Sequence, residues 1–162
     1  SLAEPDMVDT ARRIMDGAAA HNCQILIPQD VVVAGEFKLG AAHRLVSSDD
    51  VADGEMILDA GAESVAAATA FLDRCSTIVW NGPMGAFEIP PFDAATTALA
   101  RAVAAKTQND GVMSVAGGGD TMAALANAGV NDQFSYVSTA GGAFLEWLEG
   151  KRLPGVEALR ID

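Results

Sequence analysis

Short apolar runs rich in β-branched residues alternate with amphipathic or alanine-rich stretches along most of the chain. The apolar runs predict strands over residues 24–27, 31–34, 43–46, 56–58, 77–80, 112–116 and 134–138. Apolar residues at helical spacing predict helices over residues 5–22, 62–74, 92–107, 120–128 and 141–149. Strands that alternate with helices typically form a parallel sheet through right-handed crossovers. The predicted class is therefore α/β: a three-layer, Rossmann-like parallel sheet with helices on both faces.

Two glycine-rich turns follow predicted strands. Residues 79–88 read Val-Trp-Asn-Gly-Pro-Met-Gly-Ala-Phe-Glu, and residues 114–121 read Ser-Val-Ala-Gly-Gly-Gly-Asp-Thr. In an open α/β sheet, ligands bind outside the carboxyl ends of the strands, where both turns are expected. Glycines let the backbone approach a ligand closely, and the helix start after Gly119 offers free N–H groups to a phosphate. Together the two turns indicate a phosphate-binding edge of the sheet.

The second turn leaves two explanations open. Residues 117–119 could form a tight strand-to-helix turn in which Asp120 is the N-cap, with Gly129 ending the helix. Alternatively, the three glycines press against a bulky anion, Asp120 helps to hold Mg²⁺ on a phosphate, and Thr121 adds a hydroxyl donor.

The first and third turns have similar alternatives. Trp80 and Phe87 are expected in the core, whereas Glu88 lies in an otherwise apolar stretch and could accept hydrogen bonds from ribose hydroxyls. The third turn, residues 138–143, contains Gly141 and Gly142. It either allows a close helix–sheet contact or provides a second ring of N–H donors. Two helix N-termini that converge on one point would stabilise a moving phosphoryl group.

Composition limits the classes of partner. The 162 residues suggest one domain or part of one, and the 50% hydrophobic content with a mean hydropathy of +0.22 can supply a core. A net charge of −12 excludes a general nucleic-acid surface, which needs a basic face. The same charge means that cations for a phosphate site must come from elsewhere. The acidic run at residues 49–55 is interpreted as a solvated turn.

The two cysteines indicate an intracellular protein rather than a metal site. Cys23 and Cys75 lie far apart and are expected to be buried, reduced thiols, which places the protein in the cytoplasm. His21 and His43 lack partners at zinc-ligand spacing. No apolar run is long enough to span a membrane, so no membrane partner is expected.

The order of these motifs resembles the nucleotide-binding half of phosphoglycerate kinase. The resemblance is carried by residues 26–31 (Leu-Ile-Pro-Gln-Asp-Val), 79–88, 117–121, 138–143 and 153–156 (Leu-Pro-Gly-Val), and it covers nearly the whole chain. It implies that residues 1–162 form part of the carboxyl-terminal, nucleotide-binding domain. It also implies that two parts of the family's chain are missing here: the amino-terminal domain, which binds the glycerate through a basic patch, and the opening of the nucleotide-binding domain, which holds lysines that would neutralise phosphate. Ser1-Leu2-Ala3-Glu4 lacks an initiator methionine and is interpreted as an internal cut.

The resemblance also implies an activity and a set of site residues. Phosphoglycerate kinase moves a phosphoryl group between 1,3-bisphosphoglycerate and ADP, giving 3-phosphoglycerate and ATP, with Mg²⁺ on the nucleotide. The implied contacts to the nucleotide are Asn81, Pro83 and Met84, with Glu88 at the ribose. Gly117, Gly118, Gly119 and Thr121 would hold phosphates, Asp120 the magnesium, and Gly118, Gly119, Gly141 and Gly142 would act on the transferring group. Ala140 and Ala95 stand where the family often has glycine.

The expected state of the chain follows from the missing part. Two strands of the family's sheet would precede Ser1 and lie between residues 24–27 and 77–80, so we expect an incomplete sheet. The chain alone is expected to be inactive and to pair with the missing segment or with a second copy, whereas the full-length enzyme is expected to be a monomer. Two alternatives stay open: a stand-alone nucleotide-binding module without transfer activity, and a structural α/β interaction domain whose glycines serve packing.

Overall fold

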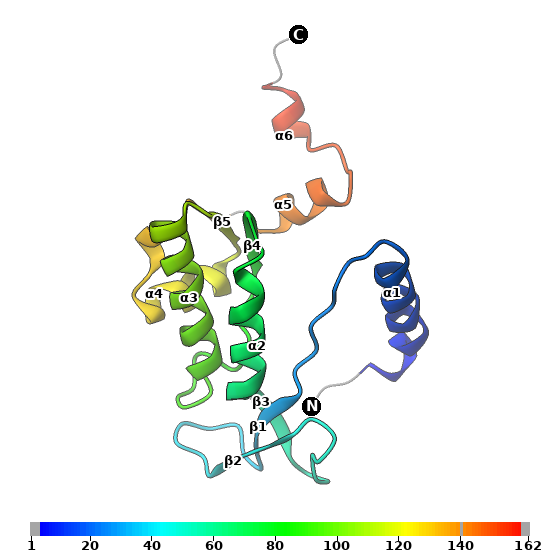
Figure 1. The fold of residues 1–162 in the computed structure, drawn as a ribbon, viewed down its shortest axis with the longest axis vertical. Coiled ribbons are helices and arrows are strands. Elements are labelled where there is room, and N and C mark those ends of the chain that lie inside the picture. The colour runs from blue at the N-terminus through cyan, green and yellow to red at the C-terminus, as the bar shows by residue number, and fades with distance from the viewer. Residues whose placement is uncertain (1–3, 140, 160–162) are drawn as a thin grey trace.

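The computed structural model describes residues 4–139 and 141–159, apart from the side chain of Phe144. Figure 1 shows the arrangement of its helices and strands. In chain order these are η1 (Pro5–Met7), α1 (Val8–Ala20), β1 (Asp30–Ala34), β2 (His43–Ser47), β3 (Met56–Ala60), α2 (Ala62–Leu72), β4 (Thr77–Asn81), α3 (Ala94–Asp110), β5 (Met113–Gly117), α4 (Gly119–Ala128), η2 (Asn131–Gln133), β6 (Tyr136–Ser138), α5 (Gly141–Leu148) and α6 (Pro154–Glu157). None of the helices described is long and apolar enough to cross a membrane.

A parallel sheet of three strands, in the order β4-β5-β6, forms the centre of the fold. Helices α3, α4 and α5 contact its middle strand β5, and α2 packs against α3. The core between these elements buries large apolar side chains, among them Trp80, Leu99, Val103, Leu125 and Phe134. The predicted class, α/β with an incomplete parallel sheet, is confirmed.

A second sheet was not expected from the pattern. Strands β1, β2 and β3 form an antiparallel sheet in the order β2-β1-β3. These three strands follow one another without an intervening helix, and their connections, residues 35–42 and 48–55, are short. A parallel pair needs a crossover of a dozen or more residues, whereas short loops are sufficient for antiparallel pairs. The prediction of parallel pairing was therefore wrong for these strands.

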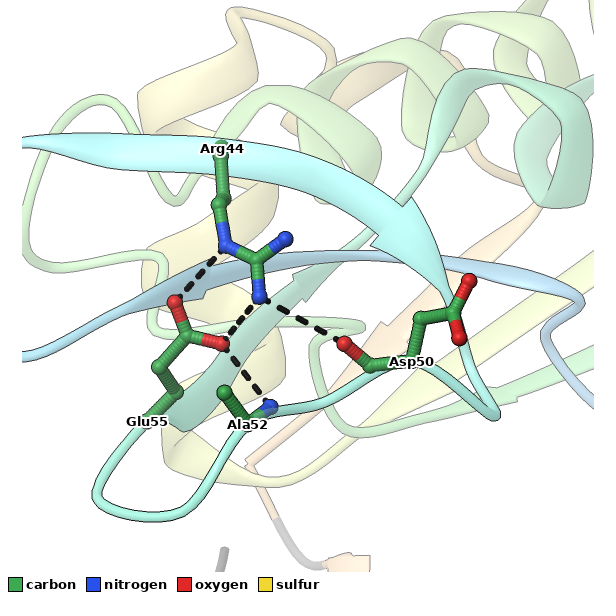
Figure 2. A network of polar contacts seen from close by, with 4 residues as sticks. All are labelled: Arg44, Asp50, Ala52 and Glu55. Atoms are coloured by element: carbon green, nitrogen blue, oxygen red, sulfur yellow. Dashed lines mark hydrogen bonds and ion pairs between the residues drawn. The ribbon is translucent and has the colours of Figure 1, made fainter.

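An ion pair closes the connection between β2 and β3 (Figure 2). Glu55 accepts hydrogen bonds from Arg44 Nε at 2.8 Å and Arg44 Nη2 at 2.6 Å, and a third from the Ala52 N–H at 3.0 Å. Arg44 also donates to the Asp50 carbonyl oxygen at 3.4 Å. The hydrogen bonds from Arg44 and Ala52 lower the pKa of Glu55. The acidic run at residues 49–55 is thus an ordered turn held by a bidentate ion pair, not only a solvated one.

The amino-terminal part of the chain differs most from its prediction. Residues 24–27 are extended but are not paired with any strand in the described part of the chain, and Ile27 is 64% exposed. Cys23, expected to be buried, is exposed. No residue of α1 is buried, and Figure 1 shows α1 standing apart from the sheets at the end of this extended segment. Within residues 4–139 and 141–159, strand β4 pairs with β5 alone, so its other edge has no strand partner there. The described residues form two separate sheets rather than one continuous sheet, which agrees with the expected incompleteness.

Candidate functional site

The three predicted turns begin in one row at the carboxyl edge of the parallel sheet. Asn81, Gly117 and Ser138 are the last residues of β4, β5 and β6, and each is the registered partner of its neighbour across the sheet. The turns therefore leave the sheet side by side, as expected for a ligand-binding edge of an α/β fold.

Backbone contacts and one threonine tie the turns to one another. The Gly82 N–H donates to Thr121 Oγ1 at 2.8 Å, which joins the first turn to the start of α4. The Gly118 N–H donates to the Ser138 carbonyl oxygen at 3.2 Å, which joins the second turn to the third. A Cβ atom on Gly141 would lie 2.7 Å from Gly118 N, so the start of α5 packs directly on the second turn. Helices α4 and α5 consequently begin next to each other.

The glycines at this edge differ in why a side chain is absent. Gly118 has φ +102°, a conformation that other residues rarely adopt, and Gly141 has no room for a Cβ atom. Gly119 and Gly142 lack both constraints: their φ values are ordinary, and a Cβ atom on either would meet nothing within 4 Å in the described structure. Turn geometry and packing therefore do not explain these two glycines.

The cap of α4 corrects one expectation. The helix begins at Gly119, its N-cap is Gly118, and no side chain caps it. Asp120 lies in the first turn with an exposed side chain, so it is not the N-cap. Among the described residues, none accepts a hydrogen bond from the N–H of Gly119 or Asp120. These N–H groups are the donors that a helix start offers to an anion.

The first turn is held in place by side chains for which the sequence predicted no role at the site. Trp80 Nε1 donates to the Gly82 carbonyl oxygen at 2.7 Å. Thr96, in the first turn of α3 and 1% exposed, accepts from the N–H of Met84 at 3.0 Å and of Gly85 at 3.4 Å. These contacts hold the backbone of residues 82–85 in one position relative to α3 and α4.

Asp59 on β3 is the third support and is 2% exposed. Its carboxylate accepts hydrogen bonds from the N–H of Ala95 and of Ala60, each at 2.9 Å. A Cβ atom on Gly85 would lie 2.2 Å from Asp59 Oδ1, so the loop packs on the carboxylate without space between them. Burial raises the pKa of Asp59 to about 6, the N–H donors oppose this rise, and the negative charge of Asp93 adds to it. A carboxylate within the apolar run of residues 56–60 was the signal in the sequence.

The remaining predicted contacts lie along the first turn. Asn81 and Glu88 have exposed side chains, and Pro83 is half-buried. Met84 lines a groove that is formed mainly by residues 24–29, residues 47–49 and helix α2. The other predicted nucleotide residues do not line this groove. The predicted core positions Trp80 and Phe87 are confirmed as buried. Ala140 lies outside the described residues, so the third turn is described only at its two ends.

The donor set around Asp120 limits what cation could bind there. The described residues contain no group of three His, Cys, Asp or Glu side chains that could hold a metal ion. A single carboxylate suits an Mg²⁺ ion that takes its other ligands from phosphates and water, and does not suit a site built from protein ligands alone.

Comparison with known proteins assigns the family. The family model for phosphoglycerate kinase matches residues 1–151. The chain belongs to the phosphoglycerate kinase family. A phosphoglycerate kinase of Xanthobacter autotrophicus is 64% identical over 160 residues, which cover 99% of this chain and 40% of that protein. One from Xanthobacter flavus is 62% identical with the same coverage.

Solved structures of phosphoglycerate kinases have the same fold over this segment. The enzyme from Coxiella burnetii superposes with a TM-score of 0.90 at 45% identity, covering 97% of this chain and 39% of that one. The enzyme from Pyrococcus horikoshii gives a TM-score of 0.77 at 28% identity. The chain thus spans about 40% of the length of the curated relatives it matches, and the resemblance drawn from the motifs is confirmed.

Proposed function

We propose that this chain forms most of the nucleotide-binding, carboxyl-terminal domain of a phosphoglycerate kinase. The complete enzyme would transfer a phosphoryl group between 1,3-bisphosphoglycerate and ADP, giving 3-phosphoglycerate and ATP. The observation that carries this proposal is the pair Gly119 and Gly142, which face open space at two adjoining helix starts. Neither position needs a glycine for folding, whereas a phosphate chain lying against the backbone would need one at both.

The nucleotide would lie along the first turn. Asn81, Pro83 and Met84 would contact its base and sugar, and Glu88, which is exposed, would accept hydrogen bonds from the ribose hydroxyls. The contacts of Trp80, Thr96 and Asp59 with residues 82–85 favour this role, because a fixed loop binds a ligand with less loss of conformational entropy than a mobile one.

The phosphates would lie on the second and third turns. The Gly119 N–H and the hydroxyl of Thr121 would donate to them, Gly117 and Gly118 would let the phosphates approach the backbone closely, and backbone N–H groups of Gly141 and Gly142 would act on the transferring group. Phosphoryl transfer depends mainly on positioning and on preorganised donors, which adjoining helix starts supply. Asp120 would hold Mg²⁺, which neutralises phosphate charge when it is bound.

The rest of the reaction needs groups outside this chain. None of the proposed site residues carries a positive charge, and the whole chain has a net charge of −12. We therefore infer that the glycerate substrates and the cations that neutralise them belong to the remainder of a cytoplasmic enzyme that works as a monomer. A nucleotide-binding module without transfer activity stays the alternative, and a purely structural domain would leave Gly119 and Gly142 unexplained.

Calorimetric titration with ADP, in the presence and absence of Mg²⁺, tests the role of Asp120. The variant Asp120→Asn removes a charge but cannot remove a helix cap, because Gly118 is the cap. It should weaken binding of Mg-ADP more than binding of metal-free ADP and leave the free energy of unfolding nearly unchanged. Equal losses for both ligands would exclude the magnesium role, and no saturable binding by the parent chain would contradict the proposed function.

The variant Gly119→Ala tests the ligand approach itself, with Gly17→Ala in α1 as its matched control. A Cβ atom at either position would meet nothing within 4 Å, and Ala replaces Gly favourably in a helix by up to about 1 kcal/mol. Neither variant should lower stability, but only Gly119→Ala should lower nucleotide affinity. If both bind as the parent does, no phosphate lies against Gly119.

A further inference from the structure

Two buried carboxylates on neighbouring strands of the antiparallel sheet perform similar structural tasks. Asp30 on β1 accepts hydrogen bonds from the N–H of Glu63 at 3.0 Å and of Ser64 at 2.7 Å, at the start of α2. Asp59 on β3 accepts from the N–H of Ala95 at 2.9 Å, at the start of α3. Strand β1 thus supplies the carboxylate that caps α2, and strand β3 supplies the carboxylate that caps α3.

A glycine packs against each carboxylate. A Cβ atom on Gly61 would lie 2.1 Å from Asp30 Oδ2, and one on Gly85 would lie 2.2 Å from Asp59 Oδ1. The two glycines belong to different parts of the chain. Gly61 is the N-cap of α2 itself, whereas Gly85 lies in the first glycine-rich turn, within the loop proposed to contact the nucleotide.

Asp59 therefore acts on that loop by two routes. Gly85 packs directly against its Oδ1 atom, and its Oδ2 atom accepts a hydrogen bond from the Ala95 N–H. The residue after Ala95 is Thr96, whose hydroxyl accepts from the Met84 and Gly85 N–H groups. The neighbouring carbonyl oxygen of Leu58 also accepts from the Ala86 N–H at 2.8 Å. The end of β3 thus fixes both the loop and the helix turn that holds the loop.

We propose that Asp59 is a positioning residue for nucleotide binding, which sets the backbone of residues 82–86 from beneath without touching the ligand. This inference rests on the proposed nucleotide function. Asp30 is also a buried carboxylate that caps a helix, but its hydrogen bonds join it to Glu63 and Ser64 and not to the loop, so it is the control that separates positioning from general stability.

The experiment compares Asp59→Asn and Asp59→Ala with Asp30→Asn and Asp30→Ala in the 162-residue chain. The first readout is amide hydrogen exchange at Met84 and Gly85 without nucleotide. The Asp59 variants should speed this exchange, because Asn offers one acceptor oxygen for two N–H groups and Ala offers none. The Asp30 variants should speed exchange at Glu63 and Ser64 and leave the loop as it is.

The second readout is the dissociation constant of Mg-ADP. The Asp59 variants should raise it about fivefold or more, whereas the Asp30 variants should leave it within error, whatever they do to stability. Equal effects of both pairs on the loop amides, or none from the Asp59 pair, would overturn the proposal. If the parent chain binds no Mg-ADP, the proposed function fails by itself, and the exchange rates still decide whether Asp59 positions the loop.

Discussion

The buried carboxylate of Asp59 makes a prediction about stability and pH. Its pKa is about 6 in the folded chain, against an ordinary value of 3.8, mainly because it is buried. Between these values the folded state keeps a proton that the unfolded state has released. Stability from this group is therefore fully present below pH 3.8 and is lost as the pH rises through 6. At about 1.36 kcal/mol per pKa unit, the loss amounts to about 3 kcal/mol.

The variant Asp59→Asn does not titrate, so it should not share this loss. Its free energy of unfolding minus that of the parent should rise by about 2.4 kcal/mol between about pH 4 and about pH 7, because part of the total is already lost at pH 4. Urea denaturation followed by circular dichroism, repeated across this range, measures both values. The other carboxylates titrate in both proteins, so their effects cancel in the difference.

Asp30 provides the control with the opposite sign. Burial by itself would raise the pKa of Asp30, but hydrogen bonds from Ser64 and Glu63 outweigh it and the pKa is lowered. Its stabilisation is present above pH 3.8 and is lost only as the pH falls further. The free energy of unfolding of Asp30→Asn should therefore lie below that of the parent by a constant amount between about pH 4 and about pH 7. Over the same range the corresponding difference for Asp59→Asn should rise. A flat or falling difference for Asp59→Asn would refute the reasoning.

Three further outcomes are expected. Replacing the buried hydroxyl in Thr96→Val leaves the Met84 and Gly85 N–H groups without their acceptor, which should cost about 1–3 kcal/mol in urea denaturation; a loss below measurement error would contradict this. The chain alone should show no phosphoglycerate kinase turnover in a coupled assay, because the proposed site carries no cations; turnover near that of a complete enzyme would be decisive against it. The free edge of β4 and the exposed residues 25–27 should make the chain associate, and a concentration-independent monomer in sedimentation velocity would exclude this.

The parallel half of the fold was predictable because its signals are local. Each strand of β4-β5-β6 is an apolar run that ends at a glycine or small-residue turn, and Gly129 ends α4 in the left-handed conformation, as expected. The errors lie where a segment depends on a neighbour. Residues 24–27 have the composition of a strand and an extended backbone, but a strand also needs a hydrogen-bonded partner, and the described chain supplies none. Cys23 directly precedes this segment and is exposed for the same reason, because no other part of the described chain packs against it.

The helix caps also show that features set by residues far away in the sequence are the ones that the sequence pattern does not predict. From the sequence, Asp120 is the obvious N-cap of α4, and Asp93 stands just before α3; yet neither caps its helix through its side chain. The caps of α2 and α3 come instead from Asp30 and Asp59, more than thirty residues earlier along the chain. A carboxylate so far from the helix it caps leaves no periodic pattern, and only a polar residue inside an apolar strand indicates it. Asp120 does not cap α4. Its exposed carboxylate lies in the first turn of the helix, where a negative charge is favourable and where it is open to a ligand bound at the helix start.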